Sequence, residues 1–186
     1  MRSKEITRLA LGAMLLAGAA QQATAAVNTV TGDTTFGPQF LRPGNYTGDT
    51  PPFITGVAYR AFDVTATVSD WQYTFITSCD FNCVSFFYNG AFDPANPHQN
   101  LVEADAHDGY NLTALMRDME PGRHYTYVVT GYYDYDWGSF STTTGGNGVV
   151  TMTLVPEPST VAMLLGGLAG LAALSRRRVG KTAQLA

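Results

Sequence analysis

The feature that most constrains the fold is a regular alternation of apolar and polar side chains near the middle of the chain. Between residues 62 and 69 every second position is apolar: Phe62, Val64, Ala66 and Val68. A period of two places these side chains on one face of an extended strand and the polar ones on the other. Because Trp71, Tyr73 and Phe75 alternate in the same way, the region predicts antiparallel strands with one face in a core.

Similar short segments recur along the chain, separated by glycine, proline, asparagine and aspartate. We expect strands over residues 34–40, 56–59, 62–68, 71–75, 84–88, 125–129, 139–144 and 149–154. Pro121-Gly122 marks a turn, and the glycine-rich spacer 145–148 is typical of a hairpin. Residues 112–119, with apolar side chains three and four apart, favour a short helix. The sequence therefore predicts an all-β fold over residues 26–154, a single antiparallel β-sandwich or jelly-roll-like domain.

Charge and aromatic content set this middle segment apart from both ends. Residues 26–155 carry 13 acidic side chains against four arginines, a net charge of −9, and hold all the aromatic residues. This acidity argues against binding nucleic acid or anionic lipid headgroups, which require a basic footprint. The aromatic content argues against disorder, and about 130 residues suffice for one core.

Residues 1–25 have the three parts of a secretory signal peptide. Arg2, Lys4 and Arg8 precede the apolar run 9–20, which is too short to span a bilayer core of roughly 30 Å. Ala23-Thr24-Ala25 supplies the small side chains for cleavage after Ala25. We therefore expect signal peptidase to release the domain outside the cytoplasm. A permanent N-terminal membrane helix is the alternative.

Residues 155–180 combine three features in a fixed order. The segment begins with Val155, Pro156, Glu157 and Pro158, which stay extended because proline blocks helix formation. A short apolar helix is expected to enter the membrane over residues 160–175. The cluster of Arg176, Arg177 and Arg178 then stays on the cytoplasmic side, and residues 181–186 form a tail. A plain anchor that is never processed is the alternative.

In this order and spacing, the segment resembles the PEP-CTERM sorting signal of Gram-negative bacteria. The resemblance implies recognition by a membrane-embedded exosortase and cleavage near Pro156-Glu157-Pro158. It also implies a precursor anchored in the inner membrane that later becomes a cell-surface or extracellular-matrix protein.

A second, looser resemblance covers residues 57–145. Phe92-Asp93-Pro94, the acidic stretch 103–109, Pro121-Gly122 and Gly138-x-Phe140 follow one another as in small exported β-sandwich proteins that carry the same tail. The order is also similar to that in bacterial pre-peptidase C-terminal domains. This resemblance implies a non-catalytic binding or accessory module.

Cys79 and Cys83 are the two cysteines of the chain. Outside the cytoplasm an even count predicts a disulfide, which here would pin a turn between two strands. Free thiols and a metal site are the alternatives, although two cysteines without a nearby histidine fall short of a closed zinc site.

Two groups of side chains are candidates for binding. Asp93, Glu103, Asp105 and Asp108 lie within 16 residues on expected loops, and carboxylates of this kind can hold Ca²⁺. A solvated acidic loop is the alternative. Tyr132, Tyr135 and Trp137 belong to an aromatic run that could stack on the sugar rings of an exopolysaccharide. The alternative is that some of these rings belong to the core.

The chain carries no familiar catalytic signature: it has no G-x-S-x-G elbow, no H-E-x-x-H and no EF-hand loop. A hydrolase would need two converging carboxylates, from Glu103, Asp105 and Asp108, or a histidine and an acid in a cleft. We therefore expect an exported, non-enzymatic surface or matrix protein that needs no cofactor. The alternative is a calcium- or carbohydrate-binding adhesion module, and a hydrolase is a third reading.

Overall fold

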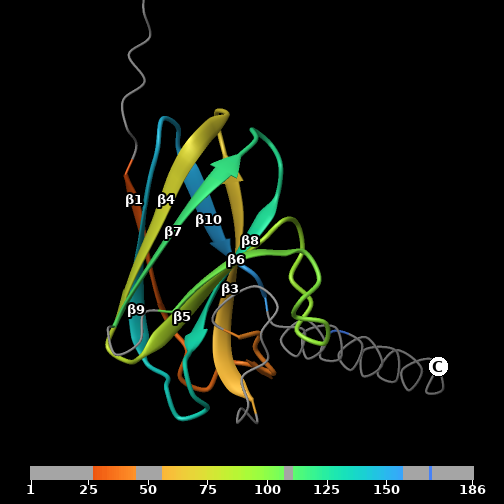
Figure 1. Ribbon diagram of the computed structural model, residues 1–186, viewed down its shortest axis with the longest axis vertical. Helices are drawn as coiled ribbons and strands as arrows, with labels where there is room; N and C mark the ends of the chain where they lie inside the picture. The colour runs from red at the N-terminus through yellow and green to blue at the C-terminus, as the bar shows by residue number, and fades with distance from the viewer. Residues whose placement is uncertain (1–26, 45–55, 107–110, 157–167, 169–186) are drawn as a thin grey trace, which may run out of the picture.

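The computed structural model describes residues 27–44, 56–106, 111–156 and 168. The expected signal peptide, the membrane segment apart from Leu168, and the C-terminal tail lie outside these ranges. The described chain is all-β, as predicted (Figure 1). Its strands are β1 (Asn28–Asp33), β2 (Gln39–Phe40), β3 (Val57–Ala66), β4 (Asp70–Cys79), β5 (Cys83–Tyr88), β6 (Leu101–Ala106), β7 (Leu112–Met119), β8 (Tyr125–Gly131), β9 (Ser139–Gly145) and β10 (Val150–Leu154). Within the described ranges, no helix has the length and apolar character needed to cross a membrane.

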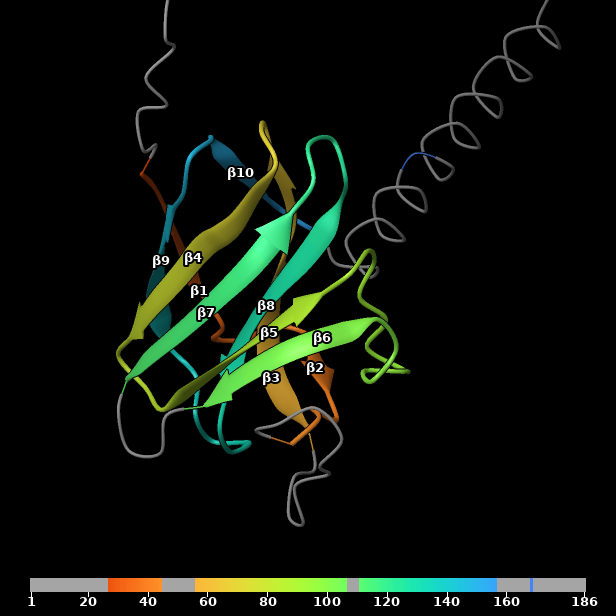
Figure 2. The same cartoon turned by 45° about the horizontal axis from the view of Figure 1, so that its top comes forward.

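The strands form two antiparallel sheets that face each other, as Figures 1 and 2 show. One sheet has the order β1-β9-β4-β7. The other has the order β10-β3-β8-β5-β6, with β2 added on β3. The Ala114 N–H of β7 donates to the Asp105 carboxylate of β6 (2.6 Å), so the two sheets approach each other along this edge. A sandwich-like domain therefore precedes the C-terminal segment.

The core between the sheets is aromatic and comes from alternating strand positions. Phe62 and Val64 of β3 point inward with Tyr73 and Phe75 of β4, and all four side chains are buried. Tyr127 of β8 stacks on Phe75 with ring centroids 5.2 Å apart. The period of two is confirmed from Phe62 to Ala66 and from Tyr73 to Phe75, but Val68 and Trp71, which the pattern places on the same face, are exposed.

The larger sheet is buried on both faces, which explains why β5 and β8 are apolar along most of their length. Its outer face carries a second cluster of buried side chains that includes Tyr59, Phe86 and Val128. Phe92, from the loop after β5, packs against Tyr59 with ring centroids 5.2 Å apart. Phe40 of β2 and Phe92 of the loop that follows β5 therefore cover part of this face.

Two of the expected elements differ from those observed. The helix expected over residues 112–119 is the strand β7, in which Thr113, Leu115 and Met119 are buried while Leu112 and Met116 are exposed. Residues 34–38 form a turn between β1 and β2 instead of belonging to one strand. The apolar spacing of three and four in β7 arises because exposed and buried apolar residues are mixed in one strand.

The glycine-rich spacer 145–148 does not close a hairpin, contrary to expectation. β9 pairs with β1 and β4 in the smaller sheet, whereas β10 pairs with β3 in the larger one. The glycines are needed because the chain crosses between the sheets directly over Tyr73, and a Cβ on Gly146 would collide with that ring. The turn expected at Pro121-Gly122 is present, with Gly122 at a φ of 73°.

Candidate functional site

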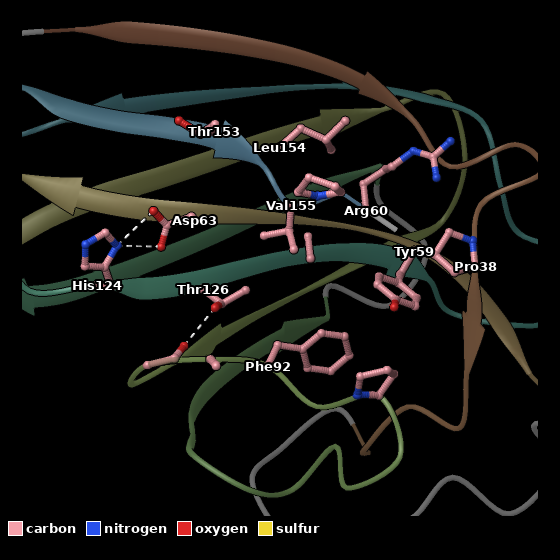
Figure 3. A pocket seen from close by; sticks show the side chains of 15 residues that line it. Pro38, Tyr59, Arg60, Asp63, Phe92, His124, Thr126, Thr153, Leu154 and Val155 are labelled. Carbon is pink, nitrogen blue, oxygen red and sulfur yellow. Dashed lines mark hydrogen bonds and ion pairs between the residues drawn. The ribbon is translucent and has the colours of Figure 1, made fainter. Parts of the chain in front are cut away.

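A groove of about 750 Å³ lies on the outer face of the larger sheet, where the loop layer leaves the strands uncovered (Figure 3). Tyr59, Ala61 and Asp63 of β3 lie along it, and residues 90–94 form one wall. The Thr126 hydroxyl donates to the Gly90 carbonyl (2.7 Å) and ties this wall to β8. The lining is predominantly apolar, with Asp63 and His124 toward one end and Arg60 toward the other (Figure 3).

The opposite wall of the groove is the beginning of the C-terminal segment. Thr153, Leu154, Val155 and Pro156 all line the groove, and Figure 3 shows Val155 in the middle of the lining. The Val155 N–H donates to the Ala61 carbonyl (2.9 Å), so pairing with β3 extends one residue beyond β10. Pro156 has no N–H and cannot continue this pairing. The Pro-Glu-Pro motif therefore begins at the residue where contact with the sheet ends.

A histidine and an acid meet at one end of this groove. The Nδ1 atom of His124 lies 2.9 Å from both carboxylate oxygens of Asp63. The His124 side chain is 69% exposed, so the pair is solvated, and the Thr126 hydroxyl in the same lining is already donated to the Gly90 carbonyl. Sequence reasoning missed this pair because the two residues are 61 positions apart.

The aromatic run after β8 forms an exposed loop, residues 132–137. Tyr135 and Trp137 are 70% and 52% exposed, whereas Tyr132 is half-buried against the outer cluster of the larger sheet. Tyr133 is exposed and stacks on Tyr135, with ring centroids 5.2 Å apart and an interplanar angle of 17°. The outward-facing set is thus Tyr133, Tyr135 and Trp137, which we call the aromatic loop set.

Buried contacts hold this loop in place. The Arg42 guanidinium lies over the Tyr132 ring, 4.9 Å from its centroid, and donates to the Tyr132 carbonyl (2.7 Å). Burial lowers the pKa of Arg42 to about 10, so the group remains a cation at neutral pH. The Tyr133 N–H donates to the Asp136 carboxylate (2.9 Å), which closes the loop on itself. Burial raises the pKa of Asp136.

The turns beside the aromatic loop are also joined to it. A disulfide links Cys79 and Cys83, and the Asn82 carbonyl in the turn it closes accepts from the Tyr132 N–H (2.9 Å). On the other side the Thr34 N–H donates to the Gly138 carbonyl (2.9 Å). Phe36 stands in that turn with a φ of 58° and a 98% exposed ring. This left-handed conformation is unfavourable for a residue with a Cβ atom.

The three described acidic candidates for calcium, Asp93, Glu103 and Asp105, do not form a metal-binding group. The Asp93 carboxylate accepts from the Ala95 N–H (2.9 Å) and lies in a loop. Glu103 and Asp105 lie in β6, not on a loop as expected: Glu103 pairs with Arg117 (3.2 Å), and Asp105 accepts from the Ala114 N–H. Asp108 lies outside the described residues. In the part of the chain that the structure covers, no three His, Cys, Asp or Glu side chains gather as a metal site.

Comparison with known proteins places one part of the chain in a family. No curated protein matches the chain. Residues 154–179 match the PEP-CTERM protein-sorting motif. The match begins at Leu154, the last residue of β10 and part of the groove wall. The chain therefore carries, directly after its last strand, the PEP-CTERM motif of an exported protein that is sorted by an exosortase.

Proposed function

We propose that this protein is delivered as a folded, non-catalytic β-sandwich to the cell surface or extracellular matrix, after exosortase cleaves it near Pro156-Glu157-Pro158. The observation that carries the proposal is the PEP-CTERM match over residues 154–179, which follows an ordered domain without an intervening linker. The aromatic core and the disulfide between Cys79 and Cys83 suit a domain that works outside the cytoplasm.

The solvent exposure of the His–acid pair in the groove favours a non-catalytic role. Asp63 and His124 lie at a solvated rim, and the hydroxyl of Thr126 is engaged with the Gly90 carbonyl. Covalent catalysis by a serine, threonine or cysteine would require that hydroxyl or thiol within hydrogen-bond reach of the base. Both cysteines are held in the disulfide.

The full chain should be expressed in matched cells that contain or lack an active exosortase. With the enzyme, mass spectrometry of the mature protein should find a new N-terminus at Ala26 and a C-terminus near residues 156–158, and fractionation should place the protein outside the inner membrane. Without the enzyme, the tail and the membrane attachment should remain. If the tail is retained in the presence of active enzyme, the proposal is wrong and the C-terminal segment is a plain membrane anchor.

A second candidate function is binding of the cell's own polysaccharide by the aromatic loop set. The observation that favours it is the stacked pair of exposed rings, Tyr133 and Tyr135, beside exposed Trp137. Flat aromatic rings held at a fixed angle offer apolar faces on which sugar rings can stack. Because the loop is anchored through Arg42 and Asn82, little conformational freedom remains to be lost on binding.

Replacement of Trp137 tests this second candidate. Trp137→Ala should abolish retention of the purified domain on the cell's own polysaccharide. Trp71→Ala is the matched control, because Trp71 is also exposed and lies at the opposite end of β4 from the disulfide. At about 3.3 Å per residue the two ends of that strand are roughly 26 Å apart between residues 71 and 79. Equal retention of wild type and Trp137→Ala would end the idea.

A further inference from the structure

The groove and the sorting motif share residues. Leu154, Val155 and Pro156 form one wall, and Leu154 and Val155 are 53% and 40% exposed. Facing them are Ala91 and Phe92 from the loop after β5. A concave, apolar surface therefore opens directly beside the first residues of the matched motif.

The length of chain between the groove and the membrane is short. The apolar segment is expected to begin at Thr160, four residues after Pro156. Four extended residues span at most about 14 Å. Before cleavage the groove is therefore held near the bilayer surface. Any enzyme that cuts between Pro156 and Pro158 has to approach the groove wall itself.

Charge decides between lipid and protein as the occupant. The segment 26–155 has a net charge of −9, so the domain as a whole repels anionic lipid headgroups, and Arg60 is the one arginine or lysine in the groove lining. A protein segment with apolar side chains is not repelled, and it can also meet the polar side chains of the lining, Asp63 and His124 at one end and Arg60 at the other (Figure 3).

We propose that this groove is a docking surface for the exosortase, so that the enzyme reads part of the folded domain together with the sorting motif. The inference rests on the proposed function. The occupant is an apolar segment of the enzyme's exported face, which lies against Val155 and Phe92 while the active site takes the adjoining Pro-Glu-Pro peptide. Docking raises the effective concentration of the cleavable peptide at the active site.

A pair of alanines in one loop provides the test. Ala91 and Ala95 are both exposed, but Ala91 lines the groove and Ala95 does not. In the full precursor, produced together with the exosortase, Ala91→Glu should slow cleavage in a pulse-chase experiment by about tenfold, equivalent to a loss of about 1.4 kcal/mol of docking free energy. Ala95→Glu adds the same charge and should be cleaved at the wild-type rate.

Three results separate this inference from its alternatives. Equal cleavage rates for Ala91→Glu, Ala95→Glu and wild type would overturn it. An uncleaved wild-type chain would overturn the proposed function instead. A change in the melting temperature of Ala91→Glu would call for the second measurement, in which a photoreactive amino acid at position 91 should cross-link to the enzyme. The same photoreactive group in place of Asp118, which is exposed on the other sheet, should not cross-link to the enzyme. If neither position cross-links, the result counts against docking.

Discussion

At the scale of single residues, the Tyr127 hydroxyl joins the two sheets inside the core. It lies 2.7 Å from the Thr77 hydroxyl of β4 in the smaller sheet, and it donates to the Ser85 hydroxyl of β5 in the larger one (2.8 Å). Thr77 also contacts Thr142, and Ser85 contacts Thr113. Each of these buried hydroxyls therefore has a partner, and the chain of hydroxyls crosses the sandwich.

Tyr127→Phe should destabilise the domain by about 1 to 2 kcal/mol. The substitution keeps the stacking on Phe75 but removes one partner from Thr77 and one from Ser85, each of which retains another. Urea unfolding followed by tryptophan fluorescence measures the difference. Tyr135→Phe removes an exposed hydroxyl and should leave the midpoint unchanged. An unchanged midpoint for Tyr127→Phe would mean that the hydroxyl chain contributes nothing net.

Asp33 provides a prediction about pH. Hydrogen bonds from the Thr35 hydroxyl and backbone N–H, together with the Ser139 hydroxyl, lower the pKa of Asp33 below its ordinary value of 3.8. A carboxyl with a lowered pKa stabilises the folded state above the unfolded pKa, and that stability is lost as the pH falls through the folded pKa.

Asp33→Asn removes the titrating group, so the melting temperatures of variant and wild type should differ most near neutral pH. The difference should shrink as the pH falls below about 4, where Asp33 of the unfolded chain takes up a proton, and it should vanish once the pH has fallen through the lowered pKa of the folded state. Thermal unfolding between neutral pH and pH of about 2.5 measures this change. A difference that stays constant over that range would show that the charge of Asp33 is not involved.

At the scale of elements, the sequence predicts strands well where one face is apolar and the other polar. β3 follows this rule from Phe62 to Ala66 and β4 follows it from Tyr73 to Phe75, but Trp71 of β4, which the pattern places on the core face, is exposed. β7 breaks it, because Leu112 and Met116 are apolar yet exposed. β9 departs from the rule in the opposite way, because the polar residues Thr142 and Thr144 are buried. Their hydroxyls form hydrogen bonds inside the fold, which the sequence alone does not reveal.

The disulfide acts on a neighbouring element as well as on its own turn. The cross-link between Cys79 and Cys83 closes a short ring, worth on the order of 2 kcal/mol. The turn it closes holds the aromatic loop through the bond from the Tyr132 N–H to the Asn82 carbonyl and through the bond from the Asp80 N–H to the Ser139 carbonyl. Loss of the cross-link should therefore loosen both segments.

Replacing both cysteines with serine should lower the free energy of unfolding by about 2 kcal/mol. Hydrogen exchange at residues 132–138 should become faster, because their anchor turn is no longer constrained. Exchange in β10, which pairs with β3 and has no bond to that turn, serves as the internal reference. Unchanged protection at residues 132–138 would show that the loop holds its shape without the cross-link.

At the scale of the whole molecule, the sorting motif was predictable from sequence and the groove was not. The motif can be recognised from residues 155–178 alone, because a proline pair, an apolar run and an arginine cluster follow one another in the sequence. The groove is assembled from Pro38, four residues of β3, the loop residues Gly90, Ala91, Phe92 and Pro94, His124, Thr126 and residues 153–156. Only the order of β10, β3 and β8 in one sheet brings these segments together, and no local pattern encodes that order.

The arrangement of domain and motif leads to a last prediction about distance. A flexible spacer of about ten Gly and Ser residues, inserted after Val155 and followed by a repeated Leu-Val pair, keeps the matched motif intact but separates it from the groove by roughly 18 Å. If the exosortase uses both surfaces, this chain should be cleaved more slowly than wild type.

Ala91→Glu should then have no further effect in the spacer chain, because the contact it disturbs is already uncoupled. Pulse-chase cleavage rates of wild type, Ala91→Glu, the spacer chain and the spacer chain with Ala91→Glu measure this coupling. Faster cleavage of the spacer chain would mean that the folded domain obstructs the enzyme, and the groove would then be a barrier rather than a docking surface.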